Sequence, residues 1–439
     1  MQAKLFDLVR RPAVVAAISV LLLRGLTLGS RFLLSVLLAR MLSPDAMGEY
    51  GLITATLAFA LLALGLEFYS FTYREMVPAS PAQRAQIIAD QIVLAAVTFA
   101  PVILLTTLAA FAGLFSARIV PWFLLILATE HLSLEATRFL IITSRPVSAY
   151  VGVFLRGGVW VYVIAALMFA IPGSRSLETV LTWWALGGTA SVVFAAFSLR
   201  GLPWGELKRP DWGWIAHGLR IARPFMLTAG GALVITYVDR FMIDLWVGRG
   251  ALGIYTFYST IMIGMLSLGT SVSHQFLPKV IAAWSAGADS YRKAVRTFFW
   301  SLAGITAGMV VLAGALIPPL LSMLQLSQYA ASIGVFFLML PGVLLRILAD
   351  VPSYALYAAK ADNSLLICNL GSAIAAIFLN LALVPALGIH GAALSGSVVS
   401  GALLTALSVL ARRRMRGAKG KPEAREAISL PTDADLLYP

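Results

Sequence analysis

Residues Ala13 to Arg40 read AVVAAISVLLLRGLTLGSRFLLSVLLAR, a mostly apolar stretch with two arginines inside it. A helix needs about 20 mostly apolar residues to cross a bilayer, and this stretch is long enough. An arginine at the centre of such a helix costs about 2.5–3.5 kcal/mol on insertion scales. Arg24 and Arg31 are two helical turns apart and share one face, with Thr27 and Ser35 near it. The stretch predicts a membrane helix whose polar face meets protein, water or an anionic ligand.

The whole chain has the composition of a membrane protein. Of its 439 residues, 60% are hydrophobic and 12% are charged, whereas about 25% are charged in soluble domains. Its net charge is +13, but the positive residues lie in short loops, where they set topology and contact anionic headgroups. No nucleic-acid partner is therefore expected. One cysteine and four histidines form no metal-ligand pattern, so neither a metal nor a cofactor is expected.

Apolar segments of spanning length recur along the chain, and positive residues concentrate in alternate loops and in both terminal segments. The positive-inside rule then places both termini in the cytoplasm, as an even number of spans requires. We expect an all-α polytopic membrane protein with about twelve transmembrane helices. The predicted spans are residues 13–39, 48–69, 87–112, 121–142, 147–171, 177–199, 222–247, 254–276, 297–320, 329–357, 365–384 and 388–410.

The sequence repeats in two halves. SPDAMGEYGLITAT after the first predicted helix aligns with GRGALGIYTFYST after the seventh, so that Gly48 and Tyr50 match Gly253 and Tyr255, an offset of 253 − 48 = 205 residues. Such repeats place a substrate path at their interface. The predicted parts are a six-helix lobe over residues 1–199, a cytoplasmic interfacial linker over 200–221, a second six-helix lobe over 222–410, and a basic, then disordered cytoplasmic tail over 411–439.

Charged side chains inside the predicted spans are candidate functional groups, because they are costly to bury in a membrane. Two arginines have an acid one turn away on the same helix. These are Arg346 with Asp350 and Arg138 with Glu135. We interpret both as structural pairs.

Other arginines in the spans form the candidate substrate-binding set. Its members are Arg24, Arg31, Arg156 and Arg240. Three of them have no acid within a helical turn, whereas Arg240 could be neutralised by Asp239 or Asp244. The arginine fork matches phosphate oxygens bidentately, so we expect this set to bind a dense anion such as a pyrophosphate. The alternative is that acids on other helices, such as Glu130 or Asp239, satisfy these arginines structurally.

The source of energy is open at this level. The chain has no GxxxxGK[ST] stretch, so ATP hydrolysis is not expected. A proton or sodium gradient could act through carboxylates in the spans, and the membrane potential could act on a cationic cavity. The ion-coupling candidates are Glu67, Glu130, Asp239 and Asp350.

Three motifs carry a family resemblance: ARMLSPDAMGEY, DRFMIDLWVGRGALGIYTFYS and LVPALGIHGAALSGSVVS. Together, over residues 13–410, they resemble Wzx-type polysaccharide-biosynthesis (O-antigen) flippases of the multidrug/oligosaccharidyl-lipid/polysaccharide (MOP) exporter superfamily. The resemblance implies a MATE-like, V-shaped, alternating-access transporter with a cavity between two lobes. It also implies movement of an undecaprenyl-pyrophosphate-linked oligosaccharide to the outer leaflet of the bacterial cytoplasmic membrane. Besides this substrate and membrane lipids, the implied partners are a polysaccharide polymerase and glycosyltransferases.

Other functions remain open from the sequence. A drug/cation antiporter of the same superfamily would need an acid-rich cavity, which the arginines in the spans disfavour. A membrane-embedded glycosyltransferase would need a sizeable soluble loop with carboxylates, and the predicted loops are short, so we expect a transporter and not an enzyme. A scaffold for polysaccharide synthesis is the third alternative.

Overall fold

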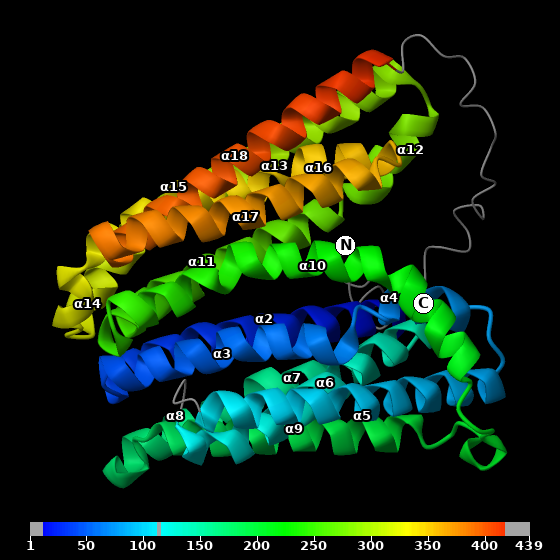
Figure 1. The fold of residues 1–439 in the computed structure, drawn as a ribbon, viewed down its shortest axis with the longest axis horizontal. Helices are drawn as coiled ribbons and strands as arrows, with labels where there is room; N and C mark the ends of the chain where they lie inside the picture. Colours follow the sequence, from blue (N-terminus) through cyan, green and yellow to red (C-terminus); the bar gives the residue numbers. More distant parts are fainter. Residues whose placement is uncertain (1–11, 112–115, 418–439) are drawn as a thin grey trace, which may run out of the picture. The chain divides into compact units, whose positions relative to one another are not determined.

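The computed structural model describes residues 12–111 and 116–417. All regular structure in these residues is helical, as predicted (Figure 1). Of the predicted tail, only residues 411–417 are described, and they continue the last helix. The disorder predicted for the rest of the tail lies outside the described residues.

Twelve helical segments of the described chain are long and apolar enough to span a membrane, which confirms the predicted number. The protein is thus a multi-pass membrane protein by the length and composition of its helices. In chain order the spans are α2 (Pro12–Met41), α3 (Pro44–Gly65), α5 (Pro81–Phe111), α6 (Val120–Ile142), α7 to α8 (Pro146–Phe154 and Trp160–Ala170), α9 (Leu177–Leu199), α10 (Trp212–Trp246), α11 to α12 (Arg249–His274 and Leu277–Ser285), α13 (Ala288–Met323), α15 to α16 (Ile333–Leu348 and Asp350–Ala358), α17 (Asp362–Leu387) and α18 (Ile389–Gly417). Two short helices lie between spans: α4 (Tyr69–Met76) and α14 (Ser327–Ala331).

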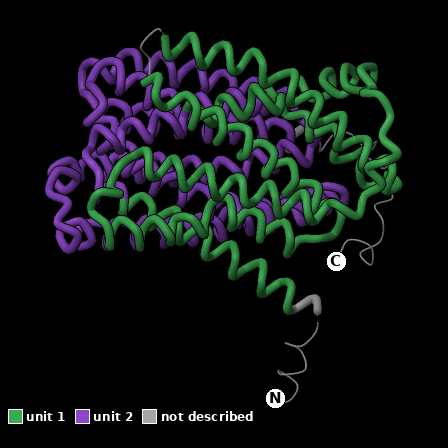
Figure 2. Tube along the Cα trace, turned by 90° about the horizontal axis from the view of Figure 1, so that it is seen from below, with its two compact units in different colours: residues 1–37, 56–226, 430–439 green, residues 38–55, 227–429 purple. Residues whose placement is uncertain are grey.

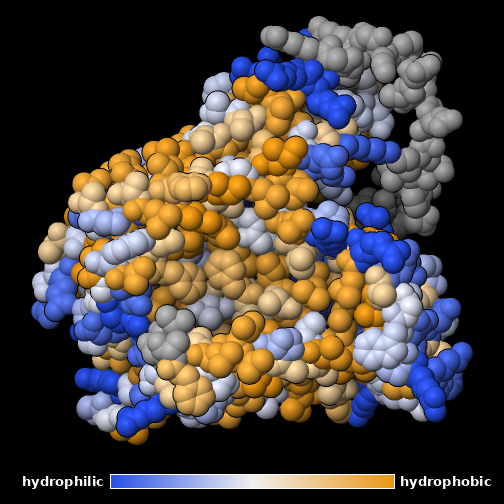
Figure 3. Space-filling view, viewed as in Figure 1, coloured by the Kyte–Doolittle hydropathy of each residue, from blue (hydrophilic) through white to orange (hydrophobic). Residues whose placement is uncertain are grey.

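The surface of these helices exposes more apolar area than is typical of a water-soluble protein. Large hydrophobic side chains are exposed along the spans, including Leu21 and Leu105 in the first half of the chain and Val311 and Phe378 in the second. Figure 3 shows hydrophobic residues over the middles of the helices and hydrophilic residues gathered at their ends. Such a large exposed apolar surface indicates contact with lipid.

The chain divides into two compact units (Figure 2). The first takes in residues 1–37, as far as they are described, and residues 56–226. The second takes in residues 38–55 and residues 227–417 of the described chain. The division falls inside α10, after the predicted linker 200–221, and it assigns the first half of α3 to the second unit.

The second half of the predicted linker is helical. Residues 212–221 form the first turns of α10, and the N–H of Trp214 donates to Asp211 Oδ1 over 2.9 Å in the opening turn. Within the first unit, the Trp214 ring packs on Phe68 and Phe71, with ring centroids 5.5 and 5.1 Å apart. This aromatic cluster gives the basic, tryptophan-rich segment an apolar face to bury, so the helix begins before the predicted span.

The two glycines matched by the repeat meet in the second unit, where the start of α3 crosses the start of α11. A Cβ added to Gly48 would lie 2.1 Å from the carbonyl oxygen of Arg249, and one added to Gly253 would lie 1.9 Å from that of Pro44. The two backbones therefore approach too closely for any other residue type. The repeated glycine marks this helix crossing.

Candidate functional site

The two arginines of α2 are exposed. Within the described residues of the first unit, neither Arg24 nor Arg31 forms an ion pair, and the guanidinium of Arg24 lies 4.8 Å from the ring centroid of Tyr150. The neighbouring hydroxyls lie on the buried side of the helix, where Ser30 Oγ donates to the carbonyl oxygen of Gly157 over 2.9 Å. Hydrogen bonds thus satisfy the hydroxyls of Thr27 and Ser30, whereas Ser35 Oγ is buried without a partner in the described chain and the two arginines are exposed.

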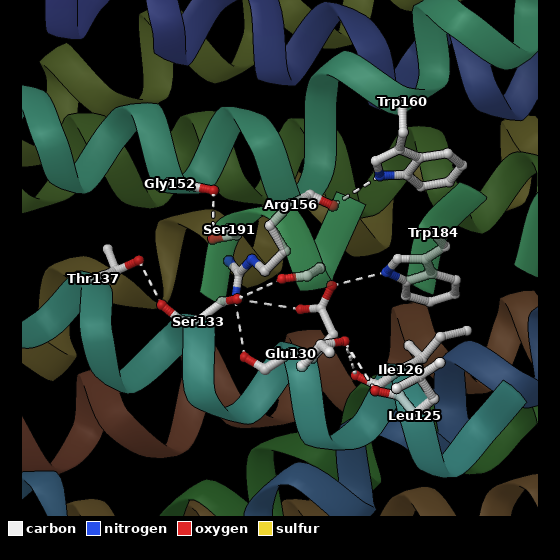
Figure 4. Close-up of polar contacts among 12 residues, drawn as sticks. Leu125, Ile126, Glu130, Ser133, Thr137, Gly152, Arg156, Trp160, Trp184 and Ser191 are labelled. Carbon is white, nitrogen blue, oxygen red and sulfur yellow. Dashed lines mark hydrogen bonds and ion pairs between the residues drawn. The ribbon is translucent and has the colours of Figure 1, made fainter. Parts of the chain in front are cut away.

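Arg156 is buried and paired (Figure 4). It lies in a π-helical turn (η2, Leu155–Val159) between α7 and α8, and its Nη1 is 3.3 Å from Oε2 of Glu130 on α6. The other carboxylate oxygen of Glu130 accepts a hydrogen bond of 2.8 Å from the indole of Trp184. In the alternative to substrate binding, an acid on another helix, such as Glu130, neutralises the arginine. The ion pair with Glu130 fits that alternative, because it compensates the charge of Arg156 within the protein.

Two tryptophans surround this pair. The Trp160 indole donates to the carbonyl oxygen of Arg156 over 2.7 Å, and its ring stacks on Trp184 with an interplanar angle of 10° and centroids 6.3 Å apart. A π-helical turn inserts one extra residue and re-aims the side chains on it. Here the turn directs Arg156 toward α6, as Figure 4 shows.

A second ionic cluster of the first unit lies near the end of α3. The predicted pair of Arg138 and Glu135 is confirmed, and Glu135 also accepts a hydrogen bond from Gln91. The guanidinium of Arg138 lies 3.5 Å from the ring centroid of Tyr69 and forms a cation–π interaction with it. The predicted span around Glu67 was too long, because α3 ends at Gly65.

Glu67 sits in the turn that follows, in left-handed backbone with φ of 54°. Burial raises the pKa of this carboxyl above its usual 4.5, although the nearby charge of Arg138 acts in the opposite direction. Glu67 therefore belongs to the turn between α3 and α4 and not to a membrane-spanning segment.

Arg240 of α10 forms hydrogen bonds to two other helices of the second unit. It is 2% exposed, and its Nη1 donates to the carbonyl oxygen of Gly51 over 3.1 Å and to Thr54 Oγ1 over 2.7 Å, both on α3. Nη2 donates to Ser259 Oγ on α11 over 3.2 Å. Asp239 does not pair with this guanidinium within the described second unit. The positive charge instead serves three hydrogen bonds to the protein.

Asp239 lines a cavity of about 120 Å³ in the second unit. The carboxylate accepts hydrogen bonds from the Tyr255 hydroxyl and the Arg240 backbone N–H. Ser259 and Arg346 also line this cavity, and most of its remaining lining is apolar. The second unit therefore holds an acid, a phenol and an arginine around one small space.

The predicted pair of Arg346 and Asp350 does not form a direct ion pair within the described second unit. The helix is divided between them, because α15 ends at Leu348 and α16 begins at Asp350, so the regular spacing of one helix is not kept. Asp350 Oδ2 is buried without a hydrogen-bond partner in the described chain. Arg346 is left to line the cavity, a role that sequence spacing could not show.

Of the predicted site residues, the structure brings together Glu130 and Arg156, whereas Asp239 accepts only the backbone N–H of Arg240 and not its guanidinium. The structure leaves Arg24 and Arg31 exposed on α2. Sequence reasoning did not assign Tyr255 or Ser259 a polar role beside Asp239. The one available signal for Tyr255 was its position in the internal repeat.

The sequence matches no protein-family model and no curated protein. The fold does match solved structures. An inward-facing multidrug resistance MATE family transporter of the MOP superfamily aligns with a TM-score of 0.76 and 13% identity, over 90% of this chain and 96% of that one. The lipid II flippase MurJ in an inward closed conformation aligns with 0.70 and 14%, over 92% and 89%. A MOP superfamily transporter from Pyrococcus furiosus aligns with 0.58 and 11%, over 93% and 96%. These similarities confirm the predicted MATE-like fold.

Proposed function

We propose that this protein is a flippase that moves an oligosaccharide linked to undecaprenyl pyrophosphate from the cytoplasmic to the outer leaflet of the bacterial cytoplasmic membrane by alternating access. The observation that carries the proposal is the contrast among the arginines. Arg138 and Arg156 are paired with acids and Arg240 is buried in hydrogen bonds, whereas Arg24 and Arg31 are exposed and form no ion pair within the first unit.

An exposed arginine in a spanning segment requires compensation for its desolvation. A pyrophosphate supplies it, because its oxygens accept the paired N–H donors of the guanidinium. The Tyr150 ring beside Arg24 favours one orientation of that guanidinium. In this proposal Arg24 and Arg31 hold the anionic headgroup, while Arg156 and Arg240 hold the helices.

Ion coupling is best supported at Asp239. It lines a cavity, and its hydrogen bond from Tyr255 would respond to protonation of the carboxyl. Glu130, by contrast, is held by Arg156 and Trp184. We propose that a proton or sodium ion acts at Asp239 and that the chain performs no covalent catalysis. A polysaccharide polymerase and glycosyltransferases are the partners that this function would require.

An ion-coupled drug/cation antiporter is the second candidate. The resemblance to a multidrug transporter fold and the acid in the cavity favour it. A scaffold without transport is the third, and it would bind synthesis enzymes without moving any lipid.

Reconstitution tests these candidates. The full chain in proteoliposomes is given a fluorescent polyprenyl-pyrophosphate glycan, and a membrane-impermeant quencher reports how fast the probe changes leaflets. We expect the R24A/R31A protein to lose at least tenfold in rate, since a hydrogen bond to a charged group contributes about 1.5–3 kcal/mol. The matched control is R118A, an exposed arginine at the end of a span. Flipping by R24A/R31A at the wild-type rate would refute the anion site. Movement of organic cations without glycan flipping would favour the antiporter.

A further inference from the structure

A groove in the second unit, remote in sequence from Arg24 and Arg31, has the lining of a lipid site. It measures about 310 Å³ and lies where α13, α16 and α18 meet. Its floor is apolar, with Phe299 from α13, Val351 and Pro352 from α16, and Leu404 from α18. The aliphatic and aromatic floor suits a hydrocarbon chain.

One end of the groove is cationic. Arg292 and Arg296 come from adjacent turns near the start of α13, and Arg412 comes from the last turns of α18. All three are exposed. Arg292 pairs with Asp289, but Arg296 and Arg412 form no ion pair within the described second unit. Two arginine charges therefore remain available at the rim.

The helical register directs these residues into the groove. Arg292, Arg296 and Phe299 follow at intervals of four and three residues and so share one face of α13. On α18, Leu404, Ser408 and Arg412 follow at intervals of four residues and likewise share one face. Each helix thus runs from an arginine at its end to an apolar residue one or two turns deeper.

The ends of these helices lie at a membrane surface. Arginines recur at the end of α18, and the positive-inside rule assigns such an end to the cytoplasmic face. Figure 3 shows hydrophilic residues at this end of α18 and hydrophobic residues along the helices next to it. The rim therefore lies at headgroup depth and the floor at the depth of the acyl chains.

We propose that this groove binds one anionic glycerophospholipid, with its phosphate on Arg296 and Arg412 and an acyl chain along Phe299, Val351 and Leu404. Charge complementarity selects an anionic headgroup, and basic pockets between helices on the cytoplasmic side are typical sites for one. A soluble phosphate would use the rim but would leave the apolar floor uncovered. The site is independent of the proposed flippase activity.

The test uses the full chain, purified in neutral detergent and mixed with phosphatidylglycerol or phosphatidylcholine, with bound lipid counted by native mass spectrometry. We expect phosphatidylglycerol to remain bound to wild type in preference to phosphatidylcholine. R296A/R412A should lose at least fivefold in bound phosphatidylglycerol. The matched control is R413A/R414A, which removes the same charge from the exposed end of α18 outside the groove. An equal loss in both variants, or no loss in R296A/R412A, overturns the proposal.

A second variant tests the floor and guards against misfolding. Leu404→Trp fills the groove but keeps all three arginines, so it should lose bound phosphatidylglycerol while its unfolding temperature stays near that of wild type. Retained lipid in this variant would overturn the assignment of the acyl chain. R296K/R412K keeps the charge, and recovery of lipid binding in it would show that the loss in R296A/R412A was electrostatic and not a folding defect.

The chain's own acidic C-terminal segment is the competing occupant, because it carries Glu423, Glu426, Asp433 and Asp435. The proposal expects bound phosphatidylglycerol to be unchanged when these four become Gln, Gln, Asn and Asn. If bound lipid instead rises at least fivefold in that variant, the segment and not the lipid is the natural occupant, and the proposal is overturned.

Discussion

Replacing Arg156 by alanine should destabilise the first unit by about 3–5 kcal/mol, the cost of leaving one member of a buried ion pair alone. The side chains of Arg156 and Glu130 are only 10% and 13% exposed. Without Arg156, the Glu130 carboxylate keeps the hydrogen bond from the Trp184 indole at 2.8 Å but loses its cationic partner. A neutral N–H donor does not compensate a buried carboxylate, so Arg156→Ala leaves the charge of Glu130 unpaired at a high cost in stability.

The double variant Glu130→Gln/Arg156→Met separates charge from packing. Glutamine keeps an acceptor for Trp184, and methionine replaces the aliphatic stem of the arginine. Because replacing both members of a buried pair is often near neutral, we expect this protein to lose less than about 1.5 kcal/mol. The difference between the single and double variants measures the coupling of the pair.

The assay is thermal unfolding in one detergent at one protein concentration, followed by circular dichroism, with chemical denaturation to convert shifts into free energies. The control is Arg24→Ala, which removes an exposed arginine that forms no ion pair within the first unit. We expect it to change stability by less than about 1 kcal/mol. If Arg156→Ala is no less stable than Arg24→Ala, the ion pair does not hold α6 to the π-helical turn and the reasoning fails.

Two further outcomes follow from the backbone and from burial. Gly48→Ala should unfold at a much lower temperature than wild type or fail to insert, because its Cβ would lie 2.1 Å from the Arg249 carbonyl oxygen. The control is Gly25→Ala, whose Cβ would meet nothing within 4 Å, and we expect it to be neutral or stabilising by up to about 1 kcal/mol. Comparable unfolding temperatures for the two would contradict the close helix crossing. Because the folded-state pKa of Glu67 is raised, its contribution to stability falls as pH rises above about 4.5 and is lost above the raised value. Glu67→Gln should therefore flatten the fall of unfolding temperature as pH rises above about 4.5. A fall as steep as in wild type would show that Glu67 is not its source.

Some side-chain contacts were predictable because they are local. Glu135 and Arg138 are three residues apart on one helix, and the helical repeat alone brings them together. The same rule was wrong for Arg346 and Asp350 as a direct pair, since it assumes an unbroken helix and the chain divides between α15 and α16. Spacing predicts a neighbour only where the helix is continuous.

Contacts between helices could not be predicted in this way. Nothing in the spacing of Arg156 and Glu130, or of Arg240 and Thr54, indicates that these residues meet. Their approach depends on crossing angles, on a π-helical turn and on close glycine contacts, which are set by packing over many residues. The residues of the candidate site could therefore be proposed from sequence, while their partners could not.

That this is a membrane protein with twelve spans and an internal repeat could be read from the sequence alone, because the apolar length of each span and the recurrence of its loops are properties of short segments. Which arginines are paired within the protein and which are exposed depends on the fold, because the helices that pack beside an arginine supply its partner. Arg156 and Arg240 are engaged by the protein, while Arg24 and Arg31 are exposed on the same helix that first indicated a membrane protein.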